Sequence, residues 1–375
     1  MTKNKKELKA TQIVGGAVGA VIGAVGGFSL MVCVDRLAAE GNKGSAIVAA
    51  SLAFILFALF YMVGLIIHEA GHLVFGLATG YKFLSFRIGS FTVVKEHGKL
   101  VQRKFTIPGT AGQCLMTHES VENPEDMPYF WYHFGGGFFN IICAVIGLLG
   151  YIACENKYAE VIFVLFCGVS ALLALMNLIP LNMGVPNDGY NIYLLHKSAL
   201  NRKLIFNSLV INGMQYKGTK LRDMPDELFE GADVHGGIYE TSIACIAASQ
   251  KLDKHDFQGA KILFLKLLDN ESLLGLYRNE CKCELMFTRI VTGDSREEAE
   301  EYYDKALKQY INVTGKTYIM RKRLMFAYYL IIEKDREKAQ LEYDKAVQMN
   351  KTYPCRGEYD SEMELIEYVR ENFSE

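Results

Sequence analysis

The stretch GSAIVAASLAFILFALFYMVGLIIHEAGH, residues 44–72, decides the architecture of this chain. From Gly44 to His68 it contains no Asp, Glu, Lys or Arg. A run of about 20 apolar residues is long enough for a helix to cross roughly 30 Å of hydrocarbon. We therefore predict a membrane-spanning helix here. The ionisable residues at its end need an explanation of their own, because such groups are costly near lipid.

Three further stretches also lack Asp, Glu, Lys and Arg, and they cover residues 10–34, 127–154 and 161–187. Only 25 charged residues lie in residues 1–190, against 57 in residues 191–375. This asymmetry predicts an α-helical membrane domain over 1–190, with about four transmembrane helices. It also predicts a soluble, all-α domain over 191–375.

Local charge gives an orientation for these helices. Residues 1–10 carry four Lys against one Glu, and residues 81–104 carry six basic side chains against Glu96 alone. Positively charged segments stay on the cytoplasmic side. We expect a multi-pass integral membrane protein, of a bacterial cell membrane, with its N-terminus and C-terminal domain in the cytoplasm. A cleaved signal peptide is the alternative for the first stretch, but that apolar run is longer than a signal peptide needs.

Residues 83–107 have the pattern of strands rather than of a helix. Aromatic and β-branched residues alternate over 83–94, the chain turns at Glu96-His97-Gly98, and a second apolar-rich run follows over 100–107. Such runs on either side of a glycine-bearing turn predict a β-hairpin.

The C-terminal half contains a degenerate repeat. Ala260, Ala299 and Ala339 recur at spacings of 39 and 40 residues, each after a longer helical segment. These segments are expected at about 239–253, 275–291 and 317–333. The pattern is similar to tetratricopeptide repeats over about 239–354, which would offer a surface for a protein partner. An irregular helical bundle is the alternative. The net charge of −2 gives no indication of a nucleic-acid partner.

The motif His68-Glu69-Ala70-Gly71-His72 ends the first quoted stretch. Positions i and i+4 share one face of a helix, so both imidazoles can bind one Zn²⁺. Glu69 is placed to take a proton from a water molecule on the zinc and to return it to the leaving amine. The competing interpretation is a pair of histidines at a helix end near the headgroups, with no metal.

A catalytic zinc has three protein ligands and one open position. Between Glu160 and Asp223 the only acidic residue is Asp188, which follows the fourth apolar stretch. The predicted topology places it on the same side of the membrane as the histidine motif, so we expect Asp188 to be the third ligand. Its alternative role is an Asp-Gly turn that ends the fourth helix.

HExxH in a membrane helix, followed by an Asn-x-x-Pro…Asp-Gly element, resembles the site-2 protease family of intramembrane zinc metalloproteases. The resemblance covers roughly residues 45–190 and implies that His68, His72 and Asp188 bind the metal. It implies that Glu69 is catalytic and that the glycine-rich element GGGFFN, residues 135–140, ends in a substrate-facing Asn140. Further matches are Asn177 and Pro180; seven residues separate Pro180 from Asp188, where the family pattern has four. The hairpin at 83–107 resembles the family's membrane-associated β-structure, which implies that it would pair with an unwound substrate strand.

The expected function is therefore an intramembrane zinc endopeptidase that cleaves a membrane-anchored protein or peptide. A non-catalytic membrane scaffold, derived from a protease core and recruiting a partner through its repeats, is the alternative, although a scaffold needs no general base. A zinc transporter would place metal ligands along several helices. The other apolar stretches offer only His133, which could line the active-site cavity or serve packing.

Overall fold

The computed structural model describes residues 2–38, 43–96, 98–107, 109–118, 123–182 and 185–373. Its contacts divide the chain into two compact units. The first unit consists of Met1–Thr79 and Pro128–His196, and the second of Gly80–Met127 and Lys197–Glu375. Each unit has a hydrophobic core of its own.

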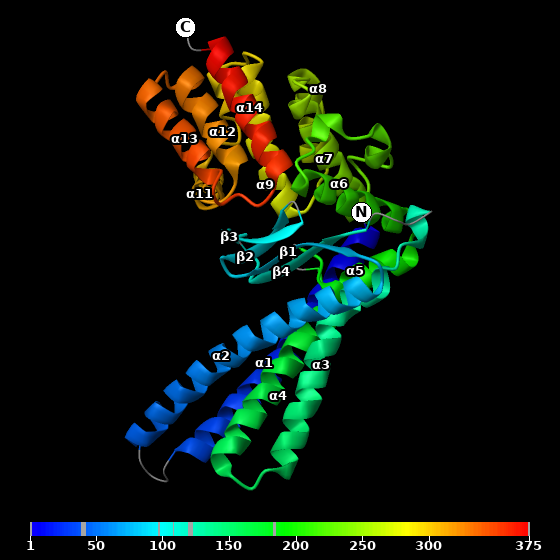
Figure 1. The fold of residues 1–375 in the computed structure, drawn as a ribbon, viewed down its shortest axis with the longest axis vertical. Helices are drawn as coiled ribbons and strands as arrows, with labels where there is room; N and C mark the ends of the chain where they lie inside the picture. Colours follow the sequence, from blue (N-terminus) through cyan, green and yellow to red (C-terminus); the bar gives the residue numbers. More distant parts are fainter. Residues whose placement is uncertain are drawn as a thin grey trace. The chain divides into compact units, whose positions relative to one another are not determined.

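The first unit is a bundle of long helices (Figure 1). Its members are α1 (Thr2–Leu37), α2 (Lys43–Ala78), α3 (Tyr129–Ala153), α4 (Lys157–Leu178) and the short α5 (Asp188–Lys197). Four segments of the described chain are long and apolar enough to cross a membrane: Gly19–Leu37, Gly44–Ala78, Pro124–Ala153 and Lys157–Leu178. The prediction of four such helices is confirmed.

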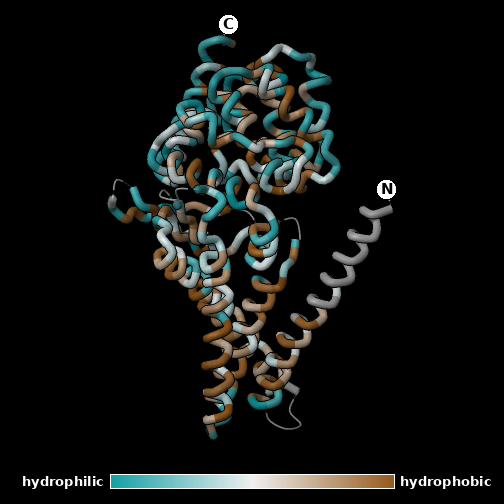
Figure 2. Tube along the Cα trace, turned by 90° about the vertical axis from the view of Figure 1, so that its right-hand side faces the viewer, coloured by the Kyte–Doolittle hydropathy of each residue, from teal (hydrophilic) through white to brown (hydrophobic). Residues whose placement is uncertain are grey.

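The long helices of this bundle consist largely of apolar residues, as the brown colouring in Figure 2 shows. Large hydrophobic side chains stand exposed on it, among them Ile47, Phe54 and Ile152, with exposed fractions of 69%, 67% and 71%. Exposed apolar patches of this extent are rare on soluble proteins and suit contact with lipid tails. The helices approach one another through small residues, since a Cβ added to Gly147 would lie 2.7 Å from the backbone nitrogen of Cys167.

α2 continues without a break through the histidine motif to Ala78, so the motif lies within an apolar helix. α4 ends at Leu178, because Pro180 has no N–H to donate and cannot continue the helix. The charge-free stretch 161–187 therefore continues beyond the end of α4.

The strands of the second unit form a four-stranded antiparallel sheet in the order β3-β2-β1-β4. The strands are β1 (Lys82–Ile88), β2 (Phe91–Glu96), β3 (Lys99–Lys104) and β4 (Gly112–Thr117). The structure has four strands where the predicted hairpin has two. The run 83–94 is two strands joined at Gly89, whose φ of 58° permits the tight turn, and β4 was not foreseen. The β2–β3 turn lies where expected, although His97 is outside the described residues.

The sheet packs with C-terminal helices of the same unit. The Thr117 hydroxyl donates to the Leu209 carbonyl at 2.9 Å, and the rings of Phe105 and Tyr353 are 5.4 Å apart. The contacts thus divide the chain differently from the single boundary expected at residue 190. Strands that the sequence interpretation grouped with the membrane helices cluster with the C-terminal helices instead.

Helices make up the rest of the second unit (Figure 1). They are α6 (Ala199–Tyr216), α7 (Ile238–Asp253), α8 (Phe257–Asp269), α9 (Gly275–Val291), α10 (Arg296–Ala299), α11 (Lys305–Thr314), α12 (Ile319–Ala327), α13 (Arg336–Met349) and α14 (Arg356–Phe373), with 3₁₀ turns at Leu221–Asp223 and Asp226–Phe229. A π-helical turn, Tyr328–Ile332, follows α12. A further 3₁₀ turn of the second unit, Pro124–Asp126, comes before α3 in the sequence. Ala260, Ala299 and Ala339 are buried in this unit's core. The tetratricopeptide-like interpretation stays a prediction.

Candidate metal centre

The two motif histidines point their Nε2 atoms at one place. One turn of α2 separates His68 from His72, so both rings lie on the same face of the helix. Their Nε2 atoms are 3.1 Å apart, and the ring planes meet at 83°. Both residues are buried, with exposed fractions of 5% and 7%. This arrangement orients two nitrogen lone pairs toward a common point.

Hydrogen bonds at the opposite ring nitrogens select one tautomer of both imidazoles. His72 Nδ1 lies 2.7 Å from the Tyr132 carbonyl oxygen, which can only accept, so Nδ1 must carry a proton. His68 Nδ1 lies 2.9 Å from Asn140 Oδ1, and the Asn140 amide nitrogen donates to the Gly64 carbonyl at 3.0 Å. Asn140 therefore accepts from His68. In the neutral form of each ring the lone pair is then on Nε2, the atom through which this tautomer can bind a metal.

Asp188 completes a triangle with these nitrogens. Its Oδ2 lies 3.2 Å from His68 Nε2 and 3.3 Å from His72 Nε2. Three ligands at about 2.0–2.1 Å in tetrahedral coordination would lie about 3.3 Å from one another. The structure thus brings His68, His72 and Asp188 into a group that could hold a metal ion. Without a cation or a shared proton, three electron-rich atoms so close together would repel one another.

A closed loop carries Asp188 to this position. The Asn187 amide nitrogen donates to the carbonyls of Met176 at 2.7 Å and Ile179 at 2.6 Å, and its oxygen accepts from the backbone of Leu181 at 3.0 Å. Asn187 thereby ties the end of α4 to the start of α5, where Asp188 is the first residue. Residues 183 and 184 of this loop are outside the described residues. The seven-residue spacing from Pro180 is accommodated because the loop folds back on itself.

The glycines of α3 leave room for the ligands. A Cβ added to Gly136 would lie 2.5 Å from His72 Nε2 and 2.8 Å from His68 Nε2. A Cβ on Gly71 would lie 2.3 Å from the Gly135 carbonyl oxygen, so α2 and α3 cross with backbone against backbone. Because a Cβ on Gly135 would likewise lie 2.6 Å from the Gly71 carbonyl oxygen, no larger residue fits at Gly71, Gly135 or Gly136 without separating the helices.

The remaining predicted residues fall into different roles. Glu69 is buried in α2, with an exposed fraction of 7%, between the two histidines in sequence. Asn140 is fully buried and its amide is engaged at both ends, so we interpret it as the residue that orients His68 rather than as a substrate contact. Asn177 donates to the Leu173 carbonyl of its own helix at 2.9 Å.

One contributor could not be identified from the sequence. The Tyr132 carbonyl, which orients His72, is a backbone group and has no signature in the residue types. His133, which the sequence offered as a residue that could line the cavity or serve packing, lies near the carboxylate, with its Nδ1 3.7 Å from Asp188 Oδ1.

Comparison of the chain with protein-family models, with curated proteins and with solved structures found no match. The case for the site therefore rests on its own geometry.

Replacing Gly136 by alanine should abolish metal binding, because the added methyl group would occupy the space in front of both Nε2 atoms. Metal content of the purified protein, measured by mass spectrometry, checks this. Gly147→Ala is the matched control, since that glycine packs as tightly in the same helix but against Cys167. Equal metal content in Gly136→Ala and wild type, or equal loss in both variants, would contradict the site.

Asn140→Ala should weaken metal affinity by roughly 10- to 100-fold, the usual effect of removing a group that orients a histidine ligand. Competition with a chelator of known affinity measures it. Asn140→Asp keeps the acceptor for His68 and should recover part of the loss. Asn177→Ala removes an asparagine whose amide donates to the Leu173 carbonyl of its own helix, and should leave the affinity unchanged. Similar losses in both alanine variants would argue against the orienting role.

Proposed function

We propose that this chain is a zinc-dependent endopeptidase that cleaves a membrane-spanning protein or peptide. The observation that carries the proposal is the triangle of His68 Nε2, His72 Nε2 and Asp188 Oδ2, with edges of 3.1, 3.2 and 3.3 Å. Two imidazoles and one carboxylate are a donor set that suits zinc and leaves one coordination position for water or substrate. A purely structural zinc site would have a fourth protein ligand, and the described residues group no fourth side chain with these three.

Glu69 is the group that this proposal assigns to proton transfer. When bound, zinc would lower the pKa of a water molecule and polarise the scissile carbonyl. Glu69 follows His68 on α2 and is buried as both histidines are, which supports this assignment. It would accept a proton as the water oxygen bonds to the carbonyl carbon, and deliver that proton to the amine nitrogen as the C–N bond breaks.

The surroundings of the site support a substrate within the membrane. The exposed face of α2 stays apolar on both sides of the motif, with Ile66 at 45%, Val74 at 48% and Leu77 at 54% exposure. Ionisable residues inside an apolar helix are costly and are usually kept for function. A substrate helix would have to unwind before cleavage, because its amides are bonded to one another.

The orientation and the substrate contact follow from the same proposal. The basic segments at 1–10 and 81–104 favour a cytoplasmic N-terminus and C-terminal domain. β3 and β4 are the edges of the described sheet, and an unwound substrate strand could pair with an edge of this kind. The protein partner expected on residues 239–354 stays a prediction.

Glu69→Gln should retain one zinc per chain and lose at least about 10³-fold in cleavage rate of a co-reconstituted substrate, because the amide cannot accept the proton. The readout is product formation in liposomes, with zinc content measured on the same sample. Glu160→Gln removes a carboxylate of the same unit that pairs with Arg36 at 3.4 Å, and should cleave normally. His68→Ala should lose both zinc and activity.

Undiminished cleavage by Glu69→Gln would overturn the proposed mechanism. A wild-type protein that purifies without stoichiometric zinc and cleaves nothing would instead support the scaffold, whose core needs neither metal nor base. The two outcomes are distinguishable because zinc content and cleavage are measured separately.

A further inference from the structure

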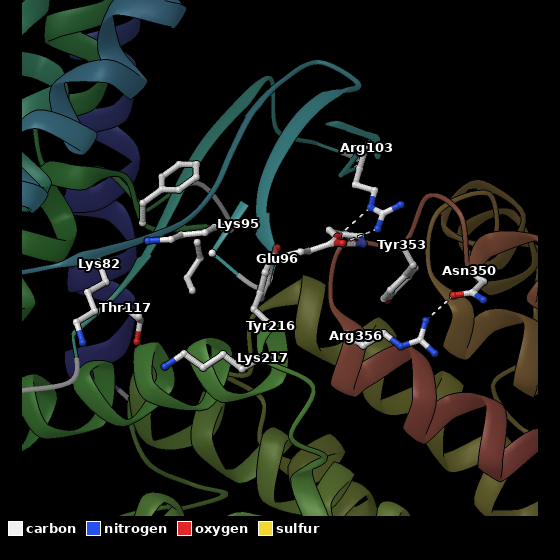
Figure 3. A pocket seen from close by; sticks show the side chains of 14 residues that line it. Lys82, Lys95, Glu96, Arg103, Thr117, Tyr216, Lys217, Asn350, Tyr353 and Arg356 are labelled. Carbon is white, nitrogen blue, oxygen red and sulfur yellow. Dashed lines mark hydrogen bonds and ion pairs between the residues drawn. The ribbon is translucent and has the colours of Figure 1, made fainter. Parts of the chain in front are cut away.

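Two cavities of the second unit are lined by more basic than acidic side chains. In the smaller, of about 410 Å³, one arginine is bound to Glu96 and the other to Asn350 (Figure 3). The larger, of about 760 Å³, is lined by side chains of α11, α12 and α13. Volumes of roughly 300–1,000 Å³ are typical of small-molecule sites. All residues that line the larger cavity belong to one compact unit, so it is a feature of that unit alone.

The lining of the larger cavity carries an excess of positive charge. It has one carboxylate, that of Glu342, and five basic residues: Lys308, Lys316, Arg321, Lys322 and Lys345. The guanidinium of Arg321 is buried and balanced, because it donates to both Glu280 and Glu284. Four lysines against one glutamate then leave a formal charge of +3 on the lining.

Two of these lysines converge on the single carboxylate. Lys322 Nζ donates to Glu342 Oε2 at 3.0 Å, and Lys345 Nζ donates to Glu342 Oε1 at 2.6 Å. The side chains of Lys322 and Glu342 are 15% and 11% exposed, and charges in such places interact more strongly than charges in bulk water. One carboxylate balances one ammonium group, so this part of the wall retains one positive charge.

The other two lysines contribute the remaining charge. Lys308 Nζ lies 4.6 Å from the centre of the Tyr303 ring, a contact that favours one position of the ammonium group and leaves its charge unbalanced. Lys316 follows the end of α11. Among the described residues, no carboxylate lies within 4.0 Å of either ammonium group. A concave surface of one charge sign focuses its field and concentrates ligands of the opposite sign.

We propose that this cavity binds a ligand with two phosphate groups. A phosphate group carries about −1.5 to −2 charges and three acceptor oxygens. One such group would leave part of the +3 lining charge unbalanced, whereas two would balance it. The basic groups that remain for a ligand are all lysines, whose compact ammonium groups suit phosphate, while bidentate binding of carboxylates is a property of arginine. Ile311 and Met325 give the wall apolar surface for the rest of the ligand.

Equilibrium dialysis of radiolabelled inorganic pyrophosphate tests this with the full-length chain in phosphatidylcholine nanodiscs and magnesium-free buffer. We expect saturable binding that weakens as salt is raised. Lys308→Gln/Lys316→Gln should bind about tenfold more weakly, since it removes two of the three unbalanced charges. Both lysines are exposed, so the fold should tolerate the change.

Two controls separate this cavity from other basic surface and from the metal centre. Lys266→Gln/Lys305→Gln removes two exposed lysines that do not line the cavity, one of them on α11, and should bind normally. His68→Ala should also bind normally, because none of the lining residues belongs to the metal centre. Equal affinities of Lys308→Gln/Lys316→Gln and Lys266→Gln/Lys305→Gln would overturn the proposal, as would loss of binding in His68→Ala.

A change in the opposite direction guards against misfolded variants. Glu342→Gln removes the one carboxylate of the described lining and should bind pyrophosphate about threefold more tightly, which a damaged fold would not do. Absence of saturable binding by the wild-type chain would contradict the proposal. Tighter binding of a triglutamate peptide than of pyrophosphate would contradict it too, because the cavity would then favour acidic peptides.

The two phosphate groups could belong to a soluble ester or to a lipid. Displacement of the bound pyrophosphate by ADP would assign the cavity to soluble diphosphate esters. Displacement only in nanodiscs that contain a polyprenyl diphosphate would assign it to lipids.

Discussion

The backbone crossing of α2 and α3 is the constraint on which the candidate centre depends. Gly71 and Gly135 let the two helices meet so closely that an added Cβ would lie 2.3 Å from a carbonyl oxygen. At this distance α3 supplies both the Tyr132 carbonyl and the Asn140 amide that orient the histidines. One larger side chain at the crossing would separate the orienting groups from the ligands. The close packing of α2 against α3 is therefore also what orients the two histidines.

Polar groups buried in an apolar bundle need hydrogen-bond partners or a bound ion. Both histidine Nδ1 atoms have a hydrogen bond, and His133 lies near the Asp188 carboxylate. The three candidate ligand atoms, in contrast, face one another. A cation satisfies all three at once, and no arrangement of neutral hydrogen bonds does so with both Nδ1 atoms protonated. A bound cation would therefore offset the cost of burying these residues in an apolar bundle.

Much of this could be predicted from the sequence, because it depends on local patterns. Charge-free runs predicted the apolar helices, and the i, i+4 spacing together with the scarcity of acids led to Asp188. The features that were not predicted depend on backbone groups or on contacts between residues far apart in the sequence. The Tyr132 carbonyl has no residue-type signature, the Asn187 loop closes through main-chain acceptors, and the turn at Gly89 interrupts a run that reads as one strand. The grouping of the sheet with C-terminal helices depends on contacts more than 90 residues apart, such as Thr117 with Leu209, separated by 92 positions.

Zinc K-edge X-ray absorption spectroscopy of the wild-type protein reports the atoms bound to the metal, and so tests whether His68, His72 and Asp188 hold one zinc ion. We expect one zinc per chain with two imidazole nitrogens at about 2.0–2.1 Å, oxygen in the remaining positions and no sulfur. All nine cysteines are free thiols and thus alternative ligands. Sulfur at about 2.3 Å, or no bound zinc, would contradict it.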